Sequence, residues 1–241
     1  MKKAWMELVM AILLLAGVWQ ISKEGARFVS QRRAGQAVVI LDAGHGGSDP
    51  GKIGVHGEKE KELNLQITLL LKKKLEKKDV FVILTRDSDE GLYESGSKNK
   101  KVQDLQNRVE LIHEKKPDCV VSIHQNSYTS PEVKGAQVFY FTHSAEGKKL
   151  AEDLQTSLVE GVDPANHRMA KGNTSYYLLK KTDAPAAIVE CGFLSNPQEA
   201  ELLKSKDYQQ KLADSICKGI LEYIKPDKKS EKTGKTGKTI T

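Results

Sequence analysis

Three side chains that can bind a metal ion or move a proton stand where apolar runs of the sequence come to an end. His45 follows the run VVILDAG, His124 follows Cys119–Ile123, and Glu190 follows AAIV. Each run is short and aliphatic, which is typical of a buried strand. Because such strands end at the carboxyl edge of an α/β sheet, where ligands gather, the sequence predicts that two imidazoles and one carboxylate converge on one edge.

This combination of donor groups suits a hydrolytic zinc site. Imidazole nitrogens and a carboxylate, with one position left open, are the usual protein ligands of catalytic zinc. A third protein ligand is expected at Glu58, Glu60 or Glu62, where a helix begins just after the loop that follows His45. These acids alternate with lysines, which is also typical of a solvated helix face, so spacing alone does not choose among them.

Each of these residues also has an ordinary interpretation. A single histidine at a strand end is more often a capping or hydrogen-bonding residue than a ligand, but two of them on one predicted edge favour the metal site. Glu190 is harder to explain structurally, because a carboxylate at the end of an apolar run is costly to bury unless it is paired or bound to a metal. The remaining histidines lack this context and are expected at the surface or in local hydrogen bonds: His56, His113, His143 and His167.

The segments around the candidate site alternate between predicted strands and amphipathic helices. Helix character runs from about Glu58 to Lys78, and Val80–Leu84 is an apolar strand. With the strand before His45 they form a β-α-β unit, which should be parallel and right-handed. Further helices are expected over Val102–Ile112, Leu150–Leu158 and Tyr208–Ile224, and a short one at Asn196 and Pro197. Further strands are expected over Gly135–Phe141 and Tyr176–Leu179. A mobile loop is expected over Ser88–Lys101, and an irregular segment over Val162–Thr174.

The net charge of +6 belongs to the two ends of the chain. Residues 1–34 and 225–241 each carry +4, which leaves about −2 for residues 35–224. A near-neutral body with basic ends argues against a nucleic-acid partner and leaves the ends to meet membrane lipid or an anionic wall polymer. The GKTGKT of the last segment is not a phosphate-binding loop, because neither a strand nor a helix is predicted beside it.

The N-terminal residues have the form of an export signal. Lys2 and Lys3 precede Leu8–Trp19, a stretch of twelve residues without a charge. This stretch is short for a full membrane span, and no clean small-x-small cleavage site precedes Gln20. We therefore expect a signal peptide or membrane anchor at 1–22, a linker at 23–35, one domain at 36–225 and a disordered basic tail at 226–241.

Each of the three cysteines lies in an apolar run. Buried free thiols are therefore expected at Cys119, Cys191 and Cys217 rather than a disulfide framework. A bridge between Cys119 and Cys191 would require neighbouring strands in a suitable register, which the sequence does not establish.

Four motifs, in order along the chain, resemble one family. DAGHGG with the following DPG, EKELNL at Glu60–Leu65, SIHQN at Ser122–Asn126 and VECGFLSN at Val189–Asn196 are similar to motifs of the zinc-dependent N-acetylmuramoyl-L-alanine amidases of the bacterial cell wall. The resemblance covers roughly Val38–Ile224. It implies a single α/β domain, with a twisted and mostly parallel sheet flanked by helices, and one catalytic zinc ion.

The resemblance also implies roles for individual residues. The zinc ligands fall on His45, Glu60 and His124, and Glu60 is chosen because it precedes the Lys-x-x-Asn-Leu of the motif. The catalytic glutamate falls on Glu190, which would take a proton from the attacking water and return it to the departing L-alanine nitrogen. Two residues are implied on the substrate side: Asn126 and Arg168.

The chain departs from the family pattern at a few positions beside these residues. Ala43 stands where proline is frequent, and Gln125 and Ser127 stand where small apolar residues are usual. A bulkier Gln125 next to a ligand would reshape the groove, so the departures bear on substrate specificity more than on metal binding.

The reaction implied is hydrolysis of the amide bond between N-acetylmuramic acid and L-alanine in peptidoglycan. A catalytic domain with a membrane-directing N-terminus and a short basic tail is similar in layout to germination-specific spore-cortex amidases, which remove the peptide ahead of muramic δ-lactam formation. The expected location is outside the cytoplasmic membrane, anchored or secreted to the cell wall or spore cortex space, and an activating partner protein is left open. The alternatives are a vegetative autolysin of the same activity, a non-catalytic peptidoglycan-binding protein, and a nucleotide-binding α/β protein, which would lack its GxGxxG motif here.

Overall fold

The computed structural model describes residues 5–6, 9–10, 12–14 and 35–225. The short N-terminal pieces are helical, and none of the helices in the described part of the chain is long and apolar enough to cross a membrane. The predicted linker at 23–35, apart from Gly35, and the predicted tail at 226–241 lie outside the described residues.

The domain is built on one six-stranded sheet with the order β2-β1-β3-β6-β4-β5. Neighbouring strands are parallel, except that β4 runs antiparallel to β6. This arrangement confirms the predicted α/β class with a mostly parallel sheet. The strands are β1 (Val38–Ala43), β2 (Phe81–Leu84), β3 (Cys119–Asn126), β4 (Gln137–Phe141), β5 (Lys171–Asn173) and β6 (Ala186–Phe193).

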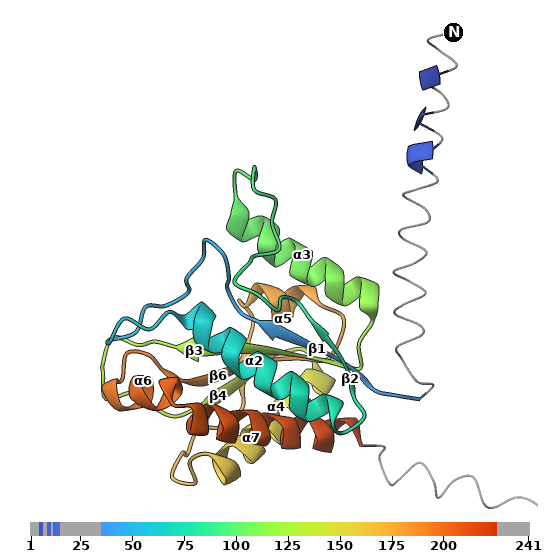
Figure 1. Cartoon of the computed structure of the whole chain (residues 1–241). Coiled ribbons are helices and arrows are strands. Elements are labelled where there is room, and N and C mark those ends of the chain that lie inside the picture. Colours follow the sequence, from blue (N-terminus) through green and yellow to red (C-terminus); the bar gives the residue numbers. More distant parts are fainter. Residues whose placement is uncertain (1–4, 7–8, 11, 15–34, 226–241) are drawn as a thin grey trace, which may run out of the picture. The chain divides into compact units, whose positions relative to one another are not determined.

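Helices cover the two faces of the sheet unequally (Figure 1). Helices α2 (Glu60–Glu76), α4 (Ala145–Gly161), α6 (Pro197–Lys204) and α7 (Lys206–Ile224) bury the larger hydrophobic core. The other face meets α3 (Lys100–Lys115) and the short α5 (Tyr177–Lys181), and its core is smaller. The less covered face therefore has room for a hollow beside the sheet.

The pleat of the strands selects which side chains face that hollow. Side chains alternate across a strand, so Val39 and Leu41 pack into the larger core while Ile40 packs into the smaller one. By the same alternation, His124 lies on the face of Val120, and Glu190 on the face of Ile188. These polar side chains thus continue the inner surface of the smaller core at the carboxyl edge of the sheet.

Two short elements correct the sequence-based expectation. The predicted strand at Tyr176–Leu179 is wrong, because these residues lead into helix α5, whose Leu178 and Leu179 are buried together. The side chain of Asn173 caps this turn by accepting hydrogen bonds from the backbone of Ser175 and Tyr176. The strand lies instead at β5, inside the segment expected to be irregular, where three residues without an apolar pattern pair with β4.

The polar segment expected as a mobile loop makes specific contacts with the loop after β1. Its Asp89 accepts a hydrogen bond from the backbone of Gly47, and the hydroxyl of Tyr93 accepts one from the backbone of Ser48. Leu92 N also donates to a carboxylate of α3. These contacts tie the segment to the carboxyl edge of the sheet. The cysteines are buried and free, as predicted, at Cys119, Cys191 and Cys217.

Candidate metal centre

Three adjacent strands of the sheet bring the predicted site residues together. Strands β1, β3 and β6 are neighbours, and His124 lies directly opposite Glu190 in the parallel register. His45 follows β1 by one residue, and the intervening Gly44 donates a backbone hydrogen bond to Ile123 O at 3.1 Å. The convergence predicted from strand ends is therefore present in the fold.

The loop after β1 takes a backbone conformation that turns His45 toward the hollow. His45 has φ 62°, a left-handed conformation that residues with a Cβ rarely adopt, and Gly46 and Gly47 follow with positive φ. Gly44 lets this loop lie against its neighbour, because a Cβ there would come within 2.3 Å of the His124 ring. The glycines of the motif therefore allow two histidines from different strands to approach closely.

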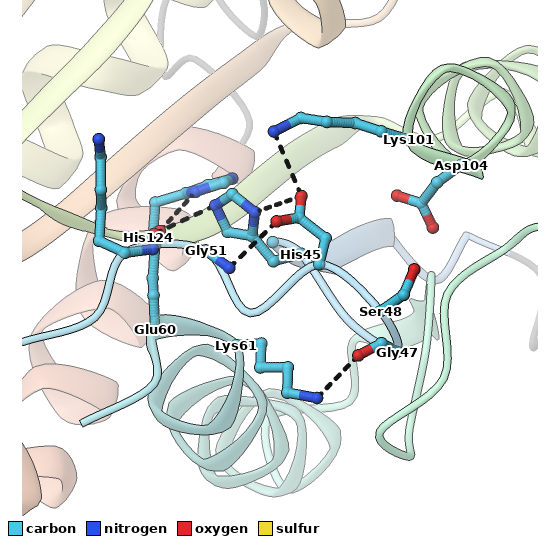
Figure 2. A network of polar contacts seen from close by, with 12 residues as sticks. His45, Gly47, Ser48, Gly51, Glu60, Lys61, Lys101, Asp104 and His124 are labelled. Atoms are coloured by element: carbon cyan, nitrogen blue, oxygen red, sulfur yellow. Dashed lines mark hydrogen bonds and ion pairs between the residues drawn. The ribbon is translucent and has the colours of Figure 1, made fainter. Parts of the chain in front are cut away.

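His45, Glu60 and His124 form a group that fits a metal ion. Their candidate ligand atoms all lie within 4.8 Å of one another. Glu60 stands between the histidines, with Oε1 2.9 Å from His124 Nδ1 and Oε2 3.2 Å from His45 Nε2. Figure 2 shows the three side chains pointing toward one another. Two imidazoles and one carboxylate with an open side are a donor set that zinc uses in hydrolytic enzymes.

The structure separates Glu60 from the two acids that the spacing left as alternatives. Glu60 is in the first turn of α2 and is buried against the histidines. Glu62 points to solvent, where it pairs with Lys59. Glu58 is buried at a different place, where it pairs with Lys204 of α6. Glu60 is thus the acid of the three that joins the group.

Further hydrogen bonds orient the three candidate ligands. Asp49 Oδ2 lies 2.9 Å from Nδ1 of His45, which leaves the other ring nitrogen to face Glu60. The Glu60 carboxylate accepts from the backbone nitrogens of Lys52 at 2.8 Å and Gln125 at 3.1 Å. Partners of this kind fix the tautomer and direction of metal ligands.

The charges in this group are strongly coupled. Burial alone would raise the pKa of Glu60, but hydrogen bonds and charge from His124 and His45 outweigh it and hold that pKa well below the usual range. Burial alone would lower the pKa of His124, yet the Glu60 carboxylate raises it to about 8. The carboxylate therefore attracts positive charge at this point, which is what a cation-binding position requires.

Glu190 is the buried acid beside the group. Burial raises its pKa to about 7, against the opposing charge of His124. Its Oε1 lies 3.5 Å from the hydroxyl of Tyr176, and its buried Oε2 has no hydrogen-bond partner among the described residues. A carboxyl group that lines a hollow, with a raised pKa and one oxygen without a partner, suits proton transfer.

The hollow itself has a volume of about 550 Å³ and is lined by residues of β1, β3, β6 and α3 and of the loops beside them. Tyr176, Tyr177 and Leu178 are among the lining residues, and Lys52 and Lys101 bring positive charge to the lining. The apolar run at 186–189 indicated Glu190 in the sequence, whereas Tyr176 was missed because its segment resembled a strand. The DPG beside the first motif was the one signal for Asp49.

The two residues predicted on the substrate side lie in different places. Asn126, at the end of β3, lines the hollow together with the candidate ligands. Arg168 lines a separate hollow beside α4. Its guanidinium donates to Lys134 O at 2.8 Å and to Gln137 Oε1 at 3.1 Å, and it stacks 4.9 Å from the ring of Phe193. The four histidines set aside on sequence grounds are all exposed: His56, His113, His143 and His167.

The fold and this site define a family by comparison with known proteins. Residues 39–222 match the family model described as N-acetylmuramoyl-L-alanine amidase, and the chain belongs to this family. It is 39% identical over 191 residues to the germination-specific N-acetylmuramoyl-L-alanine amidase of Bacillus subtilis, an alignment that covers 78% of this chain and 79% of the relative. It is 28% identical to the amidase AmiA of Escherichia coli, with 81% and 78% covered.

Solved structures show the same relationship. The CwlD amidase of Clostridioides difficile, determined in complex with the GerS lipoprotein, superposes with a TM-score of 0.76 at 39% identity and covers 78% of this chain and 98% of its own. An N-acetylmuramoyl-L-alanine amidase from Clostridium difficile 630 superposes with a TM-score of 0.70 at 32% identity, with 79% and 97% covered. The resemblance inferred from the four motifs is confirmed.

Proposed function

We propose that this chain is a zinc-dependent amidase that hydrolyses the bond between N-acetylmuramic acid and L-alanine in peptidoglycan. Membership of the amidase family supports the reaction. The observation that carries the assignment of zinc is the group of His45, Glu60 and His124, whose ligand atoms lie within 4.8 Å of one another next to Glu190. All four residues that the chemistry needs are present, which favours an enzyme over a non-catalytic wall-binding protein.

The side chains of the hollow have different roles in the proposed reaction. Zinc, when held by His45, Glu60 and His124, supplies Lewis-acid polarisation of the carbonyl and makes water a stronger acid. Glu190 accepts the proton of the attacking water at its free Oε2, while the Tyr176 hydroxyl stays beside Oε1. The protonated Glu190 then delivers that proton to the departing nitrogen of L-alanine, and burial of this carboxyl group, which raises its pKa, favours its holding the proton between the two steps.

The Glu190→Gln variant tests the proposed base. We expect kcat to fall by roughly 100-fold or more, because general acid–base catalysis contributes about 10²–10⁴. Zinc content should be unchanged, since Glu190 is not one of the proposed ligands. The measurement is digestion of defined muropeptides with identification of the released peptide, together with metal analysis.

Glu114→Gln, at an exposed acid of α3, is the matched control and should keep wild-type activity. Wild-type rates from Glu190→Gln would show that another group is the base. Binding of peptidoglycan by the wild-type chain without release of any stem peptide would favour the non-catalytic alternative instead.

The setting that we propose is maturation of the spore cortex, where peptide removal precedes formation of muramic δ-lactam. The support is the relative at 39% identity, whose name marks it as germination-specific. Cortex from a strain that lacks this protein should contain no muramic δ-lactam, and the wild-type chain but not Glu190→Gln should restore it. An unchanged cortex together with an altered vegetative wall would support the vegetative autolysin.

The remaining sequence-based assignments are part of the same proposal. Residues 36–225 would form the catalytic domain, exported by residues 1–22 and then anchored or secreted to the wall or cortex space. A protein partner is supported by the CwlD relative, whose structure was determined in complex with a lipoprotein.

Asn126 and Arg168 remain predicted substrate-binding residues, and alanine at either position should raise KM for muropeptides with little change in kcat.

A further inference from the structure

The loop that presents His45 has five consecutive backbone carbonyl groups, Ala43 to Gly47, and each of them accepts a hydrogen bond. Gly46 O accepts from a backbone nitrogen of the same loop. The other four accept from side chains that come from α2, from the residues after β2, and from α3. These donors are Lys61, Asn64, Arg86 and Arg108. Figure 2 shows Lys61 reaching from α2 to the backbone of Gly47.

Such an arrangement is needed because the loop holds an unfavourable backbone. The positive φ of His45 costs free energy that the surrounding structure must offset. The glycines on both sides also give the backbone of the loop more accessible conformations, which the contacts must restrict. Among the described residues, the last backbone hydrogen bond from a neighbouring strand to this loop is the one between Gly44 N and Ile123 O. These side-chain donors therefore hold the backbone that carries His45, and Asp49 holds its ring.

Arg86 differs from the other donors in what it joins. Its side chain is buried, with 6% of the residue exposed. One terminal nitrogen, Nη2, donates both to Gly44 O at 3.1 Å and to Lys61 O at 2.8 Å. Gly44 immediately precedes one proposed zinc ligand, and Lys61 immediately follows another.

The rest of the guanidinium fixes that nitrogen in place. Nε of Arg86 donates to Ala43 O at 2.9 Å, and Nη1 donates to Ser88 O at 2.9 Å. All four acceptors are backbone carbonyls. A planar group with donors in fixed directions can hold four carbonyls at once, which the single ammonium of a lysine cannot do in the same geometry.

We propose that Arg86 is a positioning residue for the metal centre, which sets the separation of His45 and Glu60 by joining the loop after β1 to the first turn of α2. This inference rests on the proposed zinc site. It assigns Arg86 no contact with substrate or zinc. The alternative is that Arg86 only stabilises the fold, as any well-satisfied buried side chain does.

Zinc affinity separates the two roles. Arg86→Lys keeps the buried charge but has one nitrogen, which cannot reach all four carbonyls, and Arg86→Met keeps the packing but has no donor. We expect both variants to bind zinc roughly 10–100-fold more weakly, which is the usual effect of losing an outer partner of metal ligands. Affinity is measured on the full chain by competition with a chromogenic zinc chelator, and the Co²⁺ absorption spectrum reports the ligand geometry.

The control is a variant that weakens the fold at a distance from the site. Leu158→Ala removes a buried side chain of α4 in the core on the other face of the sheet, and should lower the midpoint of urea unfolding without changing zinc affinity or the Co²⁺ spectrum. If Arg86→Met does not fold, Arg86→Lys decides by the same criteria.

The possible results are distinct. Weaker zinc binding and an altered Co²⁺ spectrum in the Arg86 variants, with normal values in Leu158→Ala, would support the inference. Wild-type affinity and spectrum in an Arg86 variant would overturn it while leaving the zinc site intact. If the wild-type chain bound zinc no more tightly than Glu60→Gln, which lacks one proposed ligand, the proposed metal centre would be overturned and this inference with it.

Discussion

At the scale of single residues, a buried ion pair lines the same hollow as the candidate metal centre. Asp42, the fifth residue of β1, accepts hydrogen bonds from Arg108 of α3, from the Thr85 hydroxyl at 2.7 Å and from Ser122. Arg108 is 2% exposed and also pairs with Asp104 of its own helix. Because both charges are out of water, each depends on the other for stabilisation.

The Asp42→Asn substitution should destabilise the domain strongly. It leaves the buried positive charge of Arg108 with Asp104 as its remaining acid, so the loss in free energy of unfolding should lie near the lower end of the about 3–5 kcal/mol that breaking a buried pair costs. The measurement is urea unfolding of the metal-free chain at pH 7. Asp183→Asn, at a fully exposed acid, is the matched control and should change stability by less than about 0.5 kcal/mol.

The same pair predicts how stability depends on pH. Burial alone would raise the pKa of Asp42, but Arg108, the hydrogen bonds of Ser122 and Thr85, and the charge of His124 outweigh it and lower the pKa to about 2. The unfolded chain therefore takes up the proton first as pH falls. The stabilisation is present above the ordinary aspartate pKa of about 4 and is lost as pH falls toward 2, and it amounts to about 2 kcal/mol.

The measurement is the difference in unfolding free energy between the wild-type chain and Asp42→Asn, followed from pH 6 toward pH 2. This difference should shrink by about that amount below pH 4. A difference that stays constant over the whole range would show that Asp42 does not titrate abnormally in the folded state.

Sequence reasoning reached some residues of the site and missed others for a physical reason. His45, His124 and Glu190 come directly at the ends of apolar runs. The sequence alone therefore shows that a polar group stands where burying it is costly. Glu60 lies among alternating charges, and the resemblance to a family rather than its spacing selected it. Arg86 donates to backbone carbonyls, and Arg108 reaches the His45 loop through backbone carbonyls as well. Every residue carries a carbonyl, so no side-chain pattern in the sequence indicates these contacts.

At the scale of elements, helices α4 and α7 pack unusually closely at Gly219. A Cβ added at this glycine would lie 2.8 Å from Leu154 Cα and 3.1 Å from Asp153 O, and both are backbone atoms of α4. The absence of a side chain at Gly219 therefore sets the distance between α4 and α7, two of the helices that cover the larger core.

Gly219→Ala should therefore be destabilising, although alanine is the better helix former by about 1 kcal/mol. Moving two packed helices apart typically costs about 1–3 kcal/mol, which exceeds the gain in helix propensity. Thermal unfolding of the metal-free chain measures the outcome, with Lys211→Ala on the exposed side of α7 as the control. A stabilised Gly219→Ala variant would show that the interface relaxes freely.

The elements that sequence reasoning placed correctly are the ones that bury a regular apolar pattern. The strand at Ala186–Phe193 and the long helix at Lys206–Ile224 belong to this class. The two-tyrosine, two-leucine run at 176–179 is too short to distinguish a strand from one helical turn, and β5 has no buried residue at all. The antiparallel pairing of β4 with β6 depends on contacts between distant segments, which local patterns do not contain.

At the scale of the whole molecule, the candidate metal centre connects parts of the chain that are far apart in sequence. Its residues come from the loop after β1, the first turn of α2, and β3, which span positions 45 to 124. These positions are brought together by the sheet order, so the unfolded chain does not hold the three donors in place. Binding of zinc should therefore be coupled to folding.

This coupling predicts that metal removal lowers the stability of the whole domain. A ligand that binds only the folded state stabilises it by about 2.7 kcal/mol when its free concentration is 100 times Kd. Treatment of the zinc-loaded chain with a strong chelator should therefore lower the thermal midpoint by several degrees, and added zinc should restore it. Glu60→Gln, which lacks the central carboxylate of the group, should have the same midpoint with and without chelator. If neither chelator nor zinc changed the thermal midpoint of the wild-type chain, the three donors would not hold a metal ion that contributes to folding. The proposed hydrolysis would then have to be explained without a metal ion at this position.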